Sequence, residues 1–139
     1  MKKLVIIDGN AIIHRAYHAI PPLTAKNGKM VNAVYGFTSM LLKVWKDLKP
    51  EYLAVCFDVA GGTFRHEKFE KYKATRVKAD QELYDQIPLV HEVVETFNLP
   101  IFEMKGHEAD DVIGAIVNDK KIKKEIAKGN LEAIIVTGD

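Results

Sequence analysis

Gly106-His107-Glu108-Ala109-Asp110-Asp111 is the stretch that organises this chain of 139 residues. It holds three carboxylates within four residues, and an apolar series with helical spacing begins inside it. The residues of that series are Ala109, Val112, Ile113, Ile116 and Val117. Such spacing predicts a helix with one buried face. The three acids therefore stand where a helix emerges from the core of the protein.

Three more acids follow apolar runs elsewhere in the chain. These acids and the runs before them are Asp8 after residues 4–7, Asp58 after residues 53–57 and Asp139 after residues 133–138. An apolar run without alternation is typical of a strand that is buried on both faces of a parallel sheet. Ligands of open α/β sheets bind beyond the carboxyl ends of the strands. We therefore expect all these acids to meet at one edge of a sheet.

The combined set would bring six carboxylates to that edge: Asp8, Asp58, Glu108, Asp110, Asp111 and Asp139. Like charges a few ångström apart raise each other's pKa values, and a divalent cation relieves that repulsion. Oxygen ligands favour Mg²⁺ or Mn²⁺, and the sequence has no Cys/His set with the spacing of a zinc site. The set therefore predicts a Mg²⁺ or Mn²⁺ centre. For Asp110 or Asp111 alone a simpler interpretation stays open, since an acid at a helix start complements the helix dipole.

Periodicity and turn residues predict the remaining elements. Strands are expected at residues 3–8, 53–57, 101–104 and 133–136. Helices are expected at residues 10–18, 32–48, 83–97, 109–117 and 120–128. Asn10 and Asn32 are the expected N-caps of the first two helices. Pro88 cannot donate a backbone hydrogen bond inside a helix, so the third helix is expected to start near it or to kink there. This order predicts an α/β fold of three layers, with a mostly parallel central sheet and helices on both faces.

The composition predicts a single globular domain with a sizeable core. No apolar run approaches the roughly 18 residues of a membrane span. The apolar run after Met1-Lys2-Lys3 is too short for the core of a signal peptide. Cys56 is the single cysteine, which excludes an internal disulfide and favours a reducing cytoplasm.

Residues 64–78 carry six basic and two acidic side chains, whereas residues 79–139 carry six basic and thirteen acidic ones. The basic stretch interleaves cations, which neutralise phosphates, with aromatic side chains, which stack on bases. Its candidate DNA-binding residues are Arg65, Lys68, Lys71, Tyr72, Lys73, Arg76 and Lys78. The alternative is a solvated amphipathic helix with ordinary i,i+4 ion pairs. We also expect residues 64–80 to be the most mobile part of the chain without DNA.

Seven motifs, in this order, also resemble a known family. They are Val5-Ile6-Ile7-Asp8-Gly9-Asn10, Ala33-Val34-Tyr35-Gly36-Phe37, Val55-Cys56-Phe57-Asp58, Thr63-Phe64-Arg65-His66-Glu67, Tyr72-Lys73-Ala74-Thr75-Arg76, Gly106-His107-Glu108-Ala109-Asp110-Asp111 and Val136-Thr137-Gly138-Asp139. The family is that of the 5′→3′ exonuclease domains found at the N-terminus of bacterial DNA polymerase I. These domains are flap endonucleases with a PIN-like, resolvase-like fold. The resemblance covers essentially the whole chain.

The resemblance implies a magnesium-dependent nuclease that removes 5′ flaps and RNA primers by hydrolysing phosphodiester bonds in DNA replication and repair. The residues that match ligands of a first metal ion are Asp8, Asp58, Glu108 and Asp110. Asp111 matches a nearby carboxylate that acts through water, and Asp139 matches the first ligand of a second ion. The residues that match the basic arch, which grips the scissile phosphate and the 5′ strand, are Arg65, Tyr72, Lys73 and Arg76. Catalysis would then rest on Asp8 and Asp58 as ligands and on Lys73 and Arg76 as cations.

The family pattern continues past its last motif with another aspartate, further acids and a helix–turn–helix-like module for duplex DNA. A polymerase domain lies beyond these. We therefore expect the chain to be the N-terminal part of a longer bacterial protein, in the cytoplasm at the nucleoid. Its second metal site would be incomplete, and its own activity reduced or absent.

Two other functions compete with this interpretation. An aspartyl-phosphate phosphatase also uses an aspartate at a strand end as its nucleophile, as Asp8 would be. Such enzymes usually place an acid two residues later, where this chain has Asn10, which argues against that class. The other competitor is a non-catalytic DNA-binding module. A dinucleotide-binding domain is disfavoured, because residues 7–11 contain no glycine-rich phosphate loop.

Overall fold

The computed structural model of the protein describes residues 1–58 and 77–138, with side chains from residue 81 onwards in the second range. Its strands are β1 (Lys2–Asp8), β2 (Tyr52–Cys56), β3 (Ile101–Phe102) and β4 (Leu131–Val136). Its helices are α1 (Gly9–Ala19), α2 (Asn32–Leu48), α5 (Val77–Tyr84), α6 (Ile87–Thr96), α7 (Ala109–Val117) and α8 (Lys120–Ala127). Within the described residues, none of the helices has the length and apolar character needed to cross a membrane.

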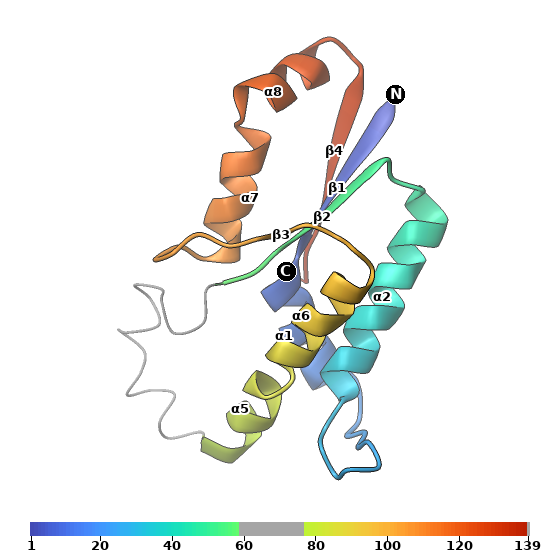
Figure 1. Ribbon diagram of the computed structural model, residues 1–139, viewed down its shortest axis with the longest axis vertical. Coiled ribbons are helices and arrows are strands. Elements are labelled where there is room, and N and C mark those ends of the chain that lie inside the picture. Colours follow the sequence, from blue (N-terminus) through green and yellow to red (C-terminus); the bar gives the residue numbers. More distant parts are fainter. Residues whose placement is uncertain (59–76, 139) are drawn as a thin grey trace.

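The four strands form one parallel sheet in the order β3-β2-β1-β4 (Figure 1). Successive side chains of β1 point to opposite faces, as expected for a strand. Val5 and Ile7 pack into a cluster with residues of α1, α2 and α6, whereas Leu4 and Ile6 pack with residues of α7. Helices therefore cover both faces of the sheet, with α7 and α8 to the left of the strands in Figure 1 and α2 to the right. The predicted three-layer, parallel α/β fold is confirmed.

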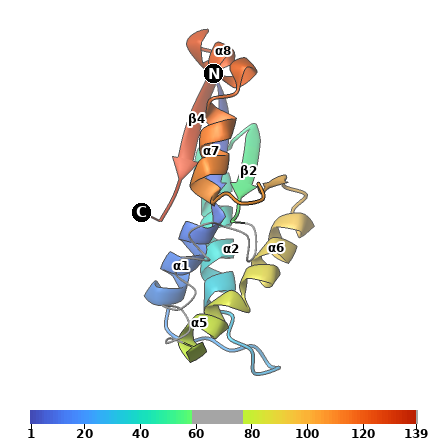
Figure 2. The ribbon, with the colours of Figure 1, turned by 90° about the vertical axis from the view of Figure 1, so that its left-hand side faces the viewer.

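The carboxyl ends of the strands and the starts of α1 and α7 come together at one edge of the sheet. Both views show that the chain leaving β4 returns to the neighbourhood of α1 (Figures 1 and 2). A Cβ atom placed on Gly138 would lie 2.7 Å from the carbonyl oxygen of Ala11. Glycine at this position therefore allows the end of β4 to approach the first turn of α1 closely.

The predicted N-caps of the first two helices are wrong. α1 follows β1 without a loop, so its N-cap is Asp8, whose Oδ1 accepts a hydrogen bond of 3.2 Å from the backbone N–H of Ala11. Asn10 lies inside the helix, and its Oδ1 accepts from the backbone N–H of Asp58 instead. Asn32 is the first residue of α2 and donates from Nδ2 to the carbonyl oxygens of Tyr17 and Ile20 at the end of α1.

The single helix predicted over residues 83–97 is two helices, α5 and α6. Pro88 lies in the first turn of α6, where its missing N–H removes no hydrogen bond, so the helix starts near this proline. Gln86, between the two helices, is fully buried. Its Oε1 accepts from the backbone N–H of Ala33 at 2.7 Å, and its Nε2 donates to Asn32 Oδ1 at 3.0 Å. This amide therefore ties α5 and α6 to the start of α2.

Replacing Gln86 with leucine should lower the free energy of unfolding by about 3 kcal/mol, because buried polar partners left unsatisfied cost about 1–3 kcal/mol each. The groups that lose Gln86 are Asn32 Oδ1, the carbonyl oxygen of Glu82 and the backbone N–H groups of Ala33 and Val34. The N–H of Ala33 still donates to Asn32 Oδ1. Urea unfolding followed by circular dichroism measures the change. Gln81→Leu is the matched control, because Gln81 is exposed and its side chain bonds Asp85, four residues further on. Equal losses in the two variants would contradict a structural role for the buried amide.

Candidate metal centre at the carboxyl edge of the sheet

A cavity of about 530 Å³ opens at the carboxyl edge of the sheet. Its lining comes from the end of β1, one face of α1, the chain just beyond β2, the start of α7 and the chain just beyond β4. Four of the predicted metal ligands are among the lining residues: Asp8, Asp58, Glu108 and Asp110. The structure thus brings together acids that are up to about a hundred residues apart in the sequence, as the strand-end pattern predicted.

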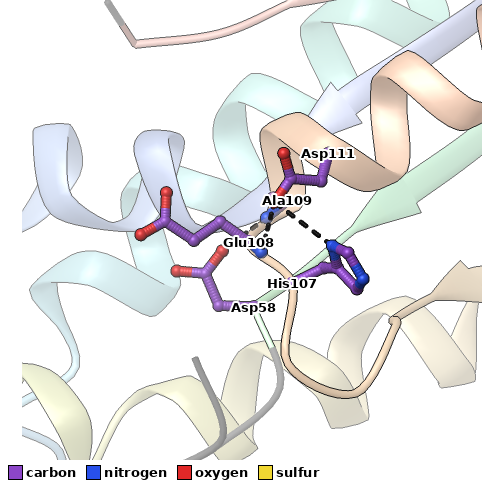
Figure 3. A network of polar contacts seen from close by, with 5 residues as sticks. All are labelled: Asp58, His107, Glu108, Ala109 and Asp111. Atoms are coloured by element: carbon purple, nitrogen blue, oxygen red, sulfur yellow. Dashed lines mark hydrogen bonds and ion pairs between the residues drawn. The ribbon is translucent and has the colours of Figure 1, made fainter. Parts of the chain in front are cut away.

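Asp58 lies beyond β2 and is held by the helix opposite. Its Oδ1 accepts a hydrogen bond of 2.6 Å from the backbone N–H of Ala109, the first residue of α7 (Figure 3). The N-terminus of a helix carries unpaired N–H groups and a partial positive charge, which favour a carboxylate there. In Figure 3 the carboxylates of Asp58 and Glu108 extend to the same side of this first turn. The contact fixes the spacing between β2 and α7 at the cavity.

Asp8 is the most enclosed of these acids, with only 4% of its surface exposed. Burial, together with a hydrogen bond and charge repulsion from Asp110 and repulsion from Asp58, raises the pKa of Asp8 from 3.8 to about 6, against the lowering effect of the Ala11 N–H. Its Oδ2 also accepts from the hydroxyl of Thr137 at 3.5 Å. The raised pKa expresses the free-energy cost of keeping several carboxylates charged in one place, a cost that a bound cation would remove.

The acidic triplet at the start of α7 is split by the structure. Asp111 is not among the residues that line the cavity. Its Oδ2 accepts from the backbone N–H of Glu108 at 3.2 Å and lies 3.6 Å from His107 Nδ1 (Figure 3). Asp111 therefore supports the start of α7 from the outside, while Glu108 and Asp110 line the cavity. Its predicted action on a metal through water stays a prediction.

Most of the other predicted site residues fall outside the described part of the chain. Asp139 lies there, as do six of the candidate DNA-binding residues: Arg65, Lys68, Lys71, Tyr72, Lys73 and Arg76. The predicted mobility of residues 64–80 stays a prediction: residues 64–76 lie in the same undescribed region, and residues 77–80 belong to α5. Lys78 lies in α5, but its side chain is not described.

The donor set fits a hard divalent cation, although it is not a closed cage. Within residues 1–58 and 77–138, no three His, Cys, Asp or Glu side chains are already arranged to hold one ion together. Mg²⁺ usually keeps several waters and takes one or two carboxylates directly, so a lined cavity suffices for it. Burial, reinforced by the charge of Asp8, raises the pKa of Cys56 to about 11, so this neighbour is a neutral thiol at pH 7. This thiol therefore does not compete with the carboxylate oxygens as a ligand.

Sequence reasoning missed the contribution of α1 to the site. Asn10, His14, Arg15 and His18 also line the cavity. Neither histidine has a partner that the sequence alone can show. Positions 11, 14, 15 and 18 fall on one face of α1, and the structure turns this face toward the cavity. That orientation follows from how α1 packs, which no local spacing shows.

Comparison with known proteins finds relatives over almost the whole chain. A family model described as "5'-3' exonuclease, N-terminal resolvase-like domain" matches residues 3–139. Over 137 residues the chain is 46% identical to DNA polymerase I of Caldicellulosiruptor bescii, a match that covers 99% of this chain and 15% of that protein. Over 113 residues it is 42% identical to a 5'-3' exonuclease of Aquifex aeolicus, covering 81% of this chain and 39% of that protein.

Two solved structures have the same fold. A T5 5'-exonuclease with bound divalent metal ions (zinc) matches with a TM-score of 0.70 at 21% identity, over 99% of this chain and 49% of that one. A bacteriophage T5 flap endonuclease, in a pseudo-enzyme-product complex with DNA and metal ions, matches with a TM-score of 0.69 at 20% identity and the same coverage. At such identities the likeness shows the fold alone. The chain spans 15% of the length of the first two curated relatives.

Proposed function

Because this chain belongs to the family of 5'-3' exonuclease N-terminal, resolvase-like domains, we propose that it forms the metal-binding catalytic core of a 5'-3' exonuclease and 5'-flap endonuclease. The reaction is hydrolysis of phosphodiester bonds in DNA. The observation that carries the proposal is the convergence of four carboxylates, from the ends of β1 and β2 and from the start of α7, on one cavity. Such an arrangement suits a divalent cation and an anionic substrate.

In this proposal Asp8, Asp58, Glu108 and Asp110 hold a first Mg²⁺ or Mn²⁺, and Asp139 begins the site of a second ion in the complete domain. Metal ions of this kind lower the pKa of a bound water and stabilise the charge that develops on a phosphate. Backbone N–H groups of the chain hold two of these carboxylates in position. The N–H of Ala109 orients Asp58, and the N–H of Ala11 orients Asp8. Lys73 and Arg76 neutralise charge on the phosphate.

The proposed substrates are DNA with a 5′ flap or a 5′ end and RNA primers paired with DNA. The proposed setting is the bacterial cytoplasm, at the nucleoid. Several of the relatives are named DNA polymerase I and are much longer than this chain, which supports a covalently linked polymerase domain in the natural polypeptide. Arg65, Lys68, Lys71, Tyr72 and Lys78 would hold the DNA strand together with Lys73 and Arg76.

A cleavage assay on a 5′-flap oligonucleotide tests the proposal. Single-turnover rates are measured for this chain and for the longest polypeptide that its gene encodes, with Mg²⁺, with Mn²⁺ and with EDTA. We expect cleavage of the longer polypeptide with either metal, none with EDTA, and a loss of at least about a hundredfold in its Asp58→Asn variant. DNA binding without cleavage under all conditions would instead support a non-catalytic DNA-binding module.

Arg76→Ala and Lys73→Ala should each weaken DNA binding and lower the slope of log affinity against log salt concentration by roughly one unit. Each cation that neutralises a phosphate releases about one condensed counterion, so its removal changes the salt dependence as well as the affinity. Fluorescence anisotropy of a labelled flap between low and moderate salt measures both quantities. Lys46→Ala, an exposed residue of α2, serves as the control. Unchanged slopes in both variants would assign the basic stretch to a solvated surface.

A further inference from the structure

We propose that Asn10 is a positioning residue of the metal centre. Its side chain holds the main chain of Asp58 in place just beyond the last hydrogen bond that the sheet provides to β2. The inference rests on the proposed function, because it assigns Asn10 a task in building the same site. Asn10 is neither acid nor base at this position, and the strand-end pattern gave it no role beyond helix capping.

The sheet stops supporting β2 just before Asp58. The pairing of β1 with β2 ends where Asp8 faces Cys56. One residue further, the N–H of Phe57 still donates to the carbonyl oxygen of Phe102 at 3.1 Å. The next backbone N–H, that of Asp58, donates to Asn10 Oδ1 at 2.9 Å. A side chain of α1 therefore replaces the strand at the first residue beyond the ladder.

The turn from β1 into α1 brings Asn10 within reach. A Cβ atom on Gly9 would lie 2.5 Å from the ring of Phe57 and 3.0 Å from the carbonyl oxygen of Cys56, so the chain passes directly against the end of β2 at this point. Asn10 follows immediately and lines the cavity beside Asp58. Its short side chain can reach the neighbouring main chain without leaving the helix.

The result is a continuous link across the site. Asn10 holds the N–H of Asp58, and Oδ1 of Asp58 accepts from the N–H of Ala109. The link joins the first turn of α1, which directly follows Asp8, to the end of β2 and to α7, which supply the other carboxylates of the cavity. Among the described residues, no hydrogen bond engages the second carboxylate oxygen of Asp58, which leaves that oxygen for a cation. Partners that orient ligands in this way typically change metal affinity by 10–100-fold when they are removed.

Two substitutions separate the hydrogen bond from other effects. Asn10→Ala removes the acceptor for the Asp58 N–H, whereas Asn10→Asp keeps an acceptor of the same shape. Asn118→Ala is the matched control, since Asn118 bonds the carbonyl oxygen of Gly114 at the far end of α7. The first measurement is hydrogen exchange of the Asp58 amide by NMR in the metal-free protein. The second is Mn²⁺ affinity by calorimetry.

We expect Asn10→Ala to speed exchange of the Asp58 amide by about tenfold, the scale of one hydrogen bond, and to lower Mn²⁺ affinity by at least about tenfold. Asn10→Asp should restore slow exchange and bind Mn²⁺ at least as tightly as the wild type, and Asn118→Ala should change neither. Unchanged exchange in Asn10→Ala, or affinity as low in Asn10→Asp as in Asn10→Ala, would overturn the assignment. If the wild type bound no Mn²⁺, the proposed function would fail, and the amide exchange alone would decide whether Asn10 holds Asp58.

Discussion

Asp8→Asn is expected to stabilise the metal-free protein at pH 8 by about 3 kcal/mol, although it removes a proposed metal ligand. The pKa of Asp8 rises from 3.8 to about 6 in the folded protein, so folding opposes its ionisation. The associated stability is fully present below pH 3.8 and is lost as the pH rises through about 6. Asparagine removes the charge and keeps an acceptor for the N–H of Ala11, so the substitution isolates the electrostatic cost.

Urea unfolding in EDTA at pH 4, 6 and 8 measures this effect. The advantage of Asp8→Asn should be small at pH 4 and largest at pH 8. Asp47→Asn, at an exposed acid of α2, serves as the control and should show no such trend. Saturating Mg²⁺ should reverse the order, because an ion that binds only the folded wild type stabilises it by mass action. An advantage of equal size at pH 4 and pH 8 would contradict the account of a strained carboxylate cluster.

Asp110→Asn is expected to lower Mn²⁺ affinity by more than about a hundredfold, while Asp111→Asn lowers it by about tenfold at most. The two acids are sequence neighbours with the same chemistry, but only Asp110 lines the cavity. Asp111 bonds the backbone N–H of Glu108, and asparagine retains an acceptor for that bond. Asp111→Asn therefore removes a charge near the site without disturbing the start of α7.

Isothermal calorimetry with Mn²⁺ compares the two variants directly, and single-turnover cleavage by the longest natural polypeptide gives the same comparison for the rate. Thermal unfolding in EDTA shows whether either variant has lost its fold. Equal losses of affinity would mean that Asp111 turns towards the cavity when metal binds. They would then contradict the division of the acidic triplet into lining and supporting residues.

The sheet and the convergence of the acids could be predicted because both follow from short-range patterns. Residues 4–7 and 53–57 are apolar without interruption. Such a run is typical of a strand that is covered on both faces of a parallel sheet. Parallel strands of this kind carry their carboxyl ends to the same edge, so Asp8 and Asp58 had to meet there. The order of the elements along the chain then left few topologies to consider.

What could not be predicted depends on contacts between residues far apart in the sequence. Gln86 acts at the start of α2, 53 residues away, and no local pattern marks it. The role of Asn10 required the position of Asp58, 48 residues later. Asp110 and Asp111 are neighbours in the first turn of α7, but Asp110 lines the cavity and Asp111 bonds the backbone of Glu108. Their spacing in the sequence does not show which of the two faces the cavity. His14 and His18 line the cavity because α1 turns that face toward it, and the packing of α1 is not visible in its sequence.

The central claim is that the cavity between β1, β2 and α7 holds a divalent cation on carboxylate oxygens. Crystals of this chain soaked in Mn²⁺ and measured at the manganese absorption edge test it most directly. The account predicts an anomalous peak in this cavity, within about 2.5 Å of an oxygen from at least one of Asp8, Asp58, Glu108 and Asp110. An empty cavity at saturating Mn²⁺, or a peak only elsewhere on the protein, would contradict it.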